Sequence, residues 1–498
     1  MNFSTKFIKY IINDSENFKF DFLKYLITEY IFGHHFIIKL LLYNKNGQRL
    51  SNKDLNEVVK YEIIKYDNLK TLFIEMVNLY FRYYSSHYSL HKTIFNYSIQ
   101  YKINLDINKR DEYGKTIIIK ANESDNFFLL KRIIKYANER KIMLNLNEID
   151  KYGNYPLLNT ICNKKYDLIK LIIKYAENNN IKLKINKKNN NGNCPFLEAV
   201  YNRDIDILEL IIEYAEKNNI KLEINKGRSY CDYPLLLAIN DQSKNEIAKL
   251  IIKYASKNNV PLKLNKANIT GNFPLLKAVE YNNIEMVKLI FKYIENENIV
   301  LEINKENRKG DSPISKAIES NYTELVKLIF EFAKKHNIIM KVNKEDKFGH
   351  FPFLESIENN NIEIVKLVME YVENVNIILG INESDENGSF PILNVIENDN
   401  IEIVKLIFEY AKKHNIIVQI NDVVNYDDYP LLISINNNNI EMVKLITEYA
   451  ENNNILLELN EASKNIIFPI LKAIEDNNTE LVKLIFEYSE KHNIIIKY

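Results

Sequence analysis

The chain has 498 residues, 46% of them hydrophobic, which is enough apolar material for an extensive core. Its 66 basic residues balance 66 acidic residues, and zero net charge argues against a nucleic-acid arm or a surface that adsorbs to membranes. The three cysteines, Cys162, Cys194 and Cys231, are too few and too far apart for a disulfide framework or a zinc site, so we expect reduced thiols.

The N-terminal region does not share the pattern of the rest of the chain. Its first thirty residues lack a basic-then-apolar secretory signal, and charged residues interrupt the apolar stretch 22–43, which excludes a membrane span. We therefore expect an intracellular protein, cytoplasmic or nuclear. We interpret residues 1–67 as a helical N-terminal cap or atypical degenerate repeats, and residues 68–108 as one degenerate repeat. A separate module in residues 1–67, with enzyme or adaptor activity, is the alternative.

The remainder, residues 109–498, is organised by evenly spaced prolines. Successive prolines are 39 residues apart, with one gap of 40, at Pro156, Pro195, Pro234, Pro274, Pro313, Pro352, Pro391, Pro430 and Pro469. A fixed period of this length is typical of solenoids, in which stacked modules share one continuous core. We expect about ten tandem repeats here.

Each repeat reads as two helices. Proline is favoured in the first turn of a helix, so Pro352 predicts a short helix of roughly nine residues. The run 359–361 is all Asn, which suits a tight turn because Asn tolerates left-handed dihedral angles. An apolar stripe after Ile362 predicts the second helix. Glu363 and Lys366 lie on its opposite face, where they can pair across turns.

The end of each repeat alternates apolar and polar residues. Ile181, Leu183 and Ile185 are two residues apart, which predicts a short strand. A glycine recurs in the following loop, at positions 114, 153, 192, 271, 310, 349 and 388. Glycine at one repeat position indicates a turn with positive φ, as in a β-hairpin.

These strings resemble the ankyrin repeat. The string from Asn265 through Gly271 and Pro274-Leu275-Leu276-Lys277-Ala278 to Glu285-Met286-Val287-Lys288-Leu289 has the family's spacing, and the match recurs about ten times in register over roughly residues 105–498. The resemblance implies an all-α, ankyrin-like α-solenoid of stacked helix-turn-helix repeats with short β-hairpin loops. It also implies a non-catalytic scaffold that binds a protein partner on its concave face.

The departures from the family are specific. The capping Thr before proline is replaced by residues such as Tyr155 and Phe273, although Thr116 is retained, and the family's His is mostly Leu, as at Leu354. We therefore expect apolar packing in place of a polar network between repeats. Ala replaces the Gly that ends the family's second helix, so we expect that helix to continue for one to two turns.

The candidate partner-binding residues vary between repeats at the loop tips or late in the first helix. They are Arg110, Lys151, Lys188, Tyr201, Tyr230, Ile269, Tyr281, Arg308, Lys347, Asp385 and Val424. We find no catalytic motif, so no catalytic, cofactor-binding or metal-binding residue is assigned, no cofactor is expected, and the chain is predicted not to be an enzyme.

A nucleic-acid-binding solenoid is the alternative for the repeats. One Tyr per repeat could form a stacking ladder for bases, but it lies on the apolar stripe of the second helix, and no continuous basic track accompanies it. We expect a partner protein of unknown identity, no nucleic acid, no membrane span and a monomer.

Overall fold

The computed structural model describes residues 95, 98, 99, 104–111, 113–227, 233–239, 245–344, 351–385, 388–422, 429–460 and 468–496. The chain divides into two compact units, Met1–Ser229 and Tyr230–Tyr498, which we call unit 1 and unit 2. The expected N-terminal cap, residues 1–67, lies outside the described residues.

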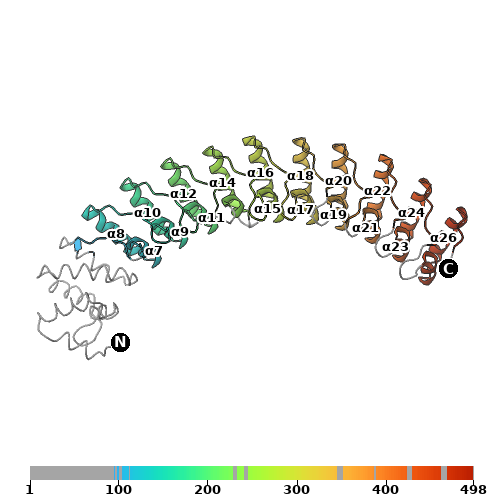
Figure 1. The fold of residues 1–498 in the computed structure, drawn as a ribbon, viewed down its shortest axis with the longest axis horizontal. Coiled ribbons are helices and arrows are strands. Elements are labelled where there is room, and N and C mark those ends of the chain that lie inside the picture. The colour runs from blue at the N-terminus through green and yellow to red at the C-terminus, as the bar shows by residue number, and fades with distance from the viewer. Residues whose placement is uncertain are drawn as a thin grey trace, which may run out of the picture. The chain divides into compact units, whose positions relative to one another are not determined.

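The described residues form a regular series of helix pairs, each a short first helix followed by a longer second helix (Figure 1). The first helices are α7 (Ile117–Glu123), α9 (Pro156–Cys162), α11 (Pro195–Tyr201), α13 (Pro234–Ala238), α15 (Pro274–Glu280), α17 (Pro313–Glu319), α19 (Pro352–Glu358), α21 (Pro391–Glu397), α23 (Pro430–Asn436) and α25 (Pro469–Glu475). The second helices are α8 (Phe127–Arg140), α10 (Tyr166–Asn178), α12 (Ile205–Lys217), α14 (Asn245–Lys257), α16 (Ile284–Glu297), α18 (Thr323–Lys335), α20 (Ile362–Asn374), α22 (Ile401–His414), α24 (Ile440–Asn452) and α26 (Thr479–Lys491).

The first helix begins at its proline, as the sequence predicts. Phe351 precedes Pro352 with an extended backbone, at φ −127° and ψ 148°, and its side chain makes no cap hydrogen bond. Ser312 is different, because its hydroxyl accepts the backbone N–H of Ser315 in a capping box. Thr116 keeps the family's hydroxyl but does not cap α7 with it. Helix α19 spans 7 residues rather than the expected nine, because the asparagine turn follows directly.

Asparagines define both ends of the second helix. In the turn between α19 and α20, Asn360 has φ 52°, and the side chain of Asn361 accepts the Ile364 N–H at 3.1 Å. Helix α20 then continues three residues beyond Tyr371 and ends at Asn374, close to the left-handed Asn376. The predicted extension is confirmed at about one turn.

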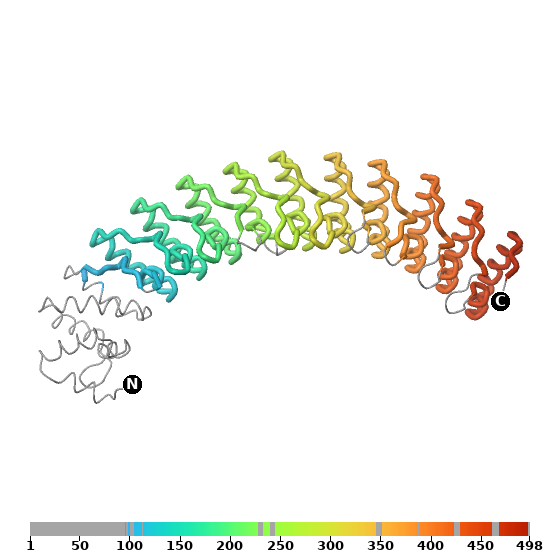
Figure 2. The backbone as a smooth tube through the Cα atoms, in the orientation of Figure 1, coloured from blue at the N-terminus to red at the C-terminus, as the bar shows by residue number. Residues whose placement is uncertain are grey.

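The hydrophobic core is continuous between neighbouring helix pairs. Helix α19 packs against α20 of its own repeat and against α17 and α21 of the neighbouring repeats. Leu354, which stands where the family has His, is buried together with Ile357 and Val365. The expected apolar packing between first helices is therefore confirmed, and Figure 2 shows how regularly the pairs follow one another within each unit.

The predicted strands are not observed among the described residues. Leu183 and Ile185 are buried and Lys182 and Lys184 are exposed, so the alternation itself is correct. However, the Ile185 N–H donates to the Leu183 carbonyl within the same segment. The Lys184 N–H donates to the side chain of Asn147 at 3.0 Å. Because the N–H groups bond to side chains or locally, no strand ladder forms, and we call these parts of the chain extended segments.

Charges on the second helices pair mainly between repeats. Lys366 Nζ lies 2.6 Å from Glu402 Oε1, and Lys444 Nζ lies 2.6 Å from Glu480 Oε1. The sequence suggested pairing within one helix, which does occur between Lys249 and Glu246 at 2.8 Å. Since these side chains are about half exposed, each pair contributes little to stability.

Candidate functional site

In most described repeats one tyrosine fastens the second helix to the preceding extended segment, whereas α18 has Phe332 at this position. The Tyr371 hydroxyl accepts the Met340 N–H at 3.0 Å and donates to the Ile338 carbonyl at 2.8 Å. Tyr214 makes the same two bonds with Leu183 and Ile181, at 2.9 and 3.4 Å. Burial raises the pKa of both phenols, so they stay protonated and can donate. These buried rings are structural and cannot stack on nucleobases.

One asparagine per repeat links neighbouring extended segments. Asn147 Nδ2 donates to the Lys182 carbonyl at 2.9 Å, and its Oδ1 accepts the Lys184 N–H. Asn304 Nδ2 donates to the Ile339 carbonyl at 2.7 Å in unit 2. The sequence predicted apolar packing in place of a polar network between repeats, and these bonds correct that expectation for the extended segments. The Asn at the end of each alternating run was the available signal.

The loop tips are held by an Asp or Asn turn. Asp150 Oδ1 accepts the N–H groups of Tyr152 and Asn154 at 2.9 and 2.8 Å, and Gly153 has φ 79°, as predicted for a positive-φ turn. The Lys151 N–H donates to the Tyr113 carbonyl of the preceding tip at 2.8 Å. Neighbouring tips are therefore fixed to each other, and their outward side chains form a defined surface.

Two of the four described candidates in unit 1 have structural roles. Arg110 Nη2 donates to the Ile149 carbonyl at 2.5 Å, and its guanidinium lies 3.5 Å from Glu148. Lys188 Nζ donates to the Gly227 carbonyl at 2.7 Å. Both side chains join one tip to the next, which leaves Lys151 and Tyr201 as the more accessible candidates.

Lys151 lies among exposed aromatic rings that the sequence reasoning missed. Its Nζ is 3.9 Å from the ring centroid of Tyr113 and 5.0 Å from that of Tyr152. Both rings are exposed, as is Tyr201 at the end of α11. We call Tyr113, Lys151, Tyr152 and Tyr201 the aromatic tip set. Tyrosines at tip positions 113 and 152, one repeat apart, were the available signal.

The candidates in unit 2 divide into accessible and buried ones. Ile269 is 57% exposed, Arg308 is exposed, and Tyr281 is half-buried with Lys277 Nζ 4.9 Å from its ring centroid. Asp385 is only 8% exposed, because its Oδ1 accepts the Ser389 N–H at 2.8 Å inside the turn. The prediction of Asp385 as a contact residue is therefore wrong. Tyr230, Lys347 and Val424 lie outside the described residues.

Reactive groups are not gathered into a site in the described parts of the chain. Burial raises the pKa of the Cys194 thiol, which keeps it protonated and weakly nucleophilic. Cys162 and Cys194 are thiols rather than members of a disulfide. No cluster of three or more His, Cys, Asp or Glu side chains that could hold a metal ion occurs in the described ranges. No described helix combines the length and apolar character that crossing a bilayer requires.

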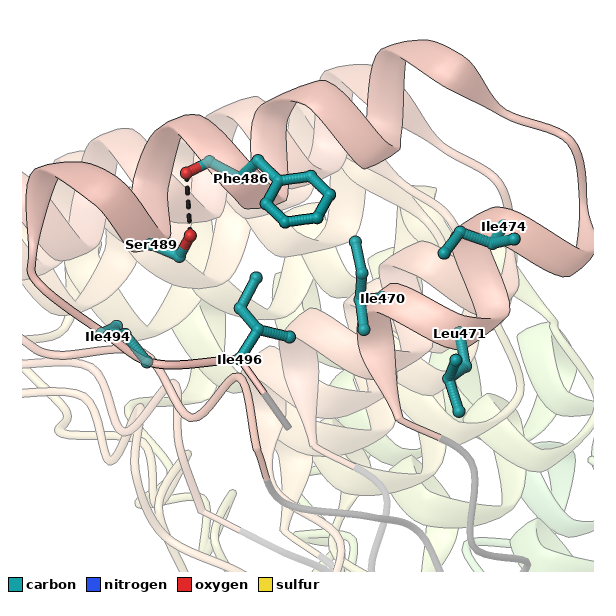
Figure 3. Close-up of a pocket in the computed structure, with 7 residues that line it drawn as sticks. All are labelled: Ile470, Leu471, Ile474, Phe486, Ser489, Ile494 and Ile496. Carbon is teal, nitrogen blue, oxygen red and sulfur yellow. Dashed lines mark hydrogen bonds between the residues drawn. The ribbon is translucent and has the colours of Figure 1, made fainter. Parts of the chain in front are cut away.

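An apolar pocket of about 360 Å³ lies at the end of the described helix pairs and is lined by Ile470, Leu471, Ile474, Phe486, Ser489, Ile494 and Ile496 (Figure 3). Ile474 is 52% exposed, whereas the corresponding Ile435 in the preceding repeat is 0% exposed. Phe408, the equivalent of Phe486 two repeats earlier, stacks on Tyr449 with ring centroids 3.9 Å apart. The pocket therefore lies on the face of the helix pair that, in earlier repeats, packs against the next repeat. It is not a small-molecule site.

Comparisons with known proteins give matches to solved structures alone. No protein-family model matches the sequence, and no curated protein matches it. The ankyrin repeat protein EF0377 is 21% identical over 43% of this chain and 97% of that chain, with a TM-score of 0.35. The ankyrin repeat domain of Bcl-3, a member of the IkappaB protein family, is 14% identical over 51% of this chain and 99% of that chain, with a TM-score of 0.38. An ankyrin repeat domain from Acinetobacter baumannii AYE is 18% identical over 43% of this chain and 97% of that chain, with a TM-score of 0.34. The regular series of helix pairs in this chain is itself consistent with ankyrin repeats, as its sequence resemblance predicts.

Proposed function

We propose that this chain is a non-catalytic scaffold that binds a partner protein through its loop tips and first helices, on the concave face that the ankyrin resemblance implies. The aromatic tip set is the observation that carries this proposal. Tyr is enriched at binding hot spots, since it brings a large contact area with a polar end. The exposed rings of Tyr113, Tyr152 and Tyr201 are not needed to fill the core.

The backbone beneath the aromatic tip set favours binding with little loss of conformational entropy. The Asp150 turn and the bond between Lys151 N–H and Tyr113 carbonyl fix two successive tips before any partner arrives. The zero net charge favours a protein partner over nucleic acid, because a strand-binding surface needs a continuous basic track.

Affinity purification with the full chain tests this function. The wild type is compared with the variant Tyr113→Ala/Lys151→Ala/Tyr152→Ala and with a control, Lys366→Ala/Lys405→Ala/Lys444→Ala, whose residues lie on second helices. We expect a stoichiometric protein partner that is lost with the tip variant and kept with the control. Recovery of RNA without such a protein, or equal recovery by both variants, contradicts the proposal.

A further inference from the structure

Unit 2 carries a row of exposed aliphatic side chains on its extended segments. They stand at one position in each of the last six described repeats and are 57% to 85% exposed: Val300, Ile339, Ile378, Ile417, Leu456 and Ile495. We call these six residues the aliphatic stripe. A half-buried isoleucine precedes each of them, at Ile299, Ile338, Ile377, Ile416, Ile455 and Ile494. The stripe is outside the tips and first helices discussed above.

The segments of the stripe are direct neighbours. Asn304, Asn343 and Asn382 donate side-chain N–H groups to the carbonyls of Ile339, Ile378 and Ile417, at 2.7, 2.7 and 2.8 Å. Asn421 and Asn460 continue the series to Leu456 and Ile495, at 2.7 and 2.9 Å. The six aliphatic side chains therefore stand in one continuous row at regular spacing.

The fold does not require aliphatic residues at this position. In unit 1 the corresponding residues are Met143, Lys182 and Lys221, and the carbonyls of the two lysines accept the same hydrogen bonds from Asn147 and Asn186, at 2.9 and 2.8 Å. Exposed apolar surface has no stabilising role in water, and continuous rows of it mark interaction sites. The stripe in unit 2 therefore calls for a partner surface.

We propose that the aliphatic stripe is the interface between two copies of this chain, paired antiparallel. A row with constant spacing matches a second copy of itself in register, whereas another partner would have to reproduce the repeat spacing. With the two-fold axis between Ile378 and Ile417, these two residues face each other across the copies. Ile339 then faces Leu456, and Val300 faces Ile495. Two-fold dimers with self-complementary patches are the commonest oligomers.

Charge selects the antiparallel order. The residues two positions after the stripe are Glu302, Lys341, Gly380, Gln419 and Glu458. In the antiparallel pairing, Lys341 of one copy faces Glu458 of the second copy, and the two-fold axis makes this contact twice. Both side chains are exposed, and neither has an ion pair within the described residues. Pairing in the same direction separates these two charges by three repeats.

The size of the stripe suits a stable dimer. Six helix pairs at a packing distance of about 8–10 Å give a row roughly 45 Å long. Five extended residues per segment give a width of about 16 Å, at about 3.3 Å per residue. The product, roughly 700 Å², is close to the ~800 Å² per partner that typical stable interfaces bury. The proposed dimer differs from the monomer expected from the sequence.

Sedimentation velocity of the full chain, from about 1 to 100 μM, tests the dimer. We expect twice the 58.8 kDa chain mass. The variant Ile339→Lys/Ile378→Lys/Ile417→Lys introduces the Lys that two repeats of unit 1 have at this position, so it should fold and sediment as a monomer. The control Ile269→Lys/Thr270→Lys/Tyr281→Lys adds the same charge elsewhere in unit 2 and should remain a dimer.

Charge reversal tests the antiparallel order. Lys341→Glu should raise the dimer dissociation constant roughly tenfold or more, because it places like charges together twice. Adding Glu458→Lys should restore the dimer to within about threefold of wild type. A monomeric wild type at 100 μM, or a stripe variant that dimerises unchanged, overturns the proposal. Failure of the double variant to recover overturns the antiparallel order. A stripe that binds lipid vesicles or a different helical protein in place of a second copy also overturns the proposal.

Discussion

The repeats of unit 1 and unit 2 have the same internal fastenings and different exposed side chains. Tyr214 and Tyr371 make equivalent hydrogen bonds, as do Asn147 and Asn304. In contrast, Lys221 stands in unit 1 where unit 2 has Ile378. The position after the last residue of α12 is Asn218, whereas α22 ends with His414 at this position. The comparison separates residues that build the repeat, which should act alike in both units, from residues that give each unit its own surface.

The largest expected effect is on the shared core. Leu197→Ala in unit 1 and Leu354→Ala in unit 2 each remove a side chain that is at most 1% exposed. We expect each to lower the free energy of unfolding by about 2–5 kcal/mol, through lost burial and a cavity. Urea unfolding of the full chain, with hydrogen exchange to locate the damaged repeat, measures this.

A matched control for the core variants is Tyr201→Ala, on the exposed end of α11. This change should alter stability by less than about 0.5 kcal/mol. A clear difference between the two leucine variants contradicts the idea that both units use one packing scheme.

A smaller effect is expected from the tyrosine hydroxyls. Tyr214→Phe and Tyr371→Phe each leave a buried N–H, of Leu183 or Met340, without its acceptor. We expect a loss of about 1–3 kcal/mol in each unit, measured by urea unfolding and by faster exchange of these two amides. The chain contains a natural comparison, because Phe332 occupies the tyrosine position in α18. If Phe332→Tyr does not slow the amide hydrogen exchange of Leu301, the tyrosine hydroxyl is not the main contact that holds the second helix to the extended segment.

The sequence predicted the features that depend on local chemistry. Proline at the start of α19, the left-handed Asn360 and the positive-φ Gly153 follow from the dihedral preferences of single residues, which the rest of the chain does not change. Apolar periodicity predicted the buried face of α20 for a similar reason. The same residues recur at equivalent positions of the repeats, so each of these features occurs many times along the described residues.

The features that depend on neighbouring repeats were harder to predict. Alternation in Ile181–Ile185 gave the correct exposure but the wrong secondary structure, because the hydrogen-bond partners are the side chains of Asn147 and Tyr214. Asp385 was wrongly predicted to be a contact residue. Neighbouring residues of the tip differ in exposure, and Asp385 stands at the buried position of the turn instead of the exposed position beside it. Exposure of the aliphatic stripe required knowing which side of each segment the next repeat covers.

The smallest expected effect concerns a charge cluster that includes a histidine in unit 2, whereas unit 1 has the same Lys–Glu pair, between Lys217 and Glu177 at 2.8 Å, followed by Asn218. Glu373 accepts from Lys413 Nζ at 2.5 Å and lies 2.8 Å from His414 Nε2. The Lys413 hydrogen bond, and after it the His414 hydrogen bond, hold the pKa of Glu373 below its usual range. A carboxyl pKa that is lowered by folding stabilises the folded state at pH values above the usual carboxyl pKa. This contribution is lost as the pH falls through the lowered pKa.

NMR titration of ¹³C-labelled glutamate measures this pKa directly. Lys413→Gln should raise the pKa of Glu373 toward the usual range. The free energy of unfolding should then fall less between neutral and acid pH than it does in the wild type. His414→Asn, which copies Asn218 of unit 1, should raise it less, because the Lys413 contact is the larger cause. Equal shifts from both variants would contradict this order, because they would mean that the His414 contact lowers the pKa of Glu373 as much as the Lys413 contact does.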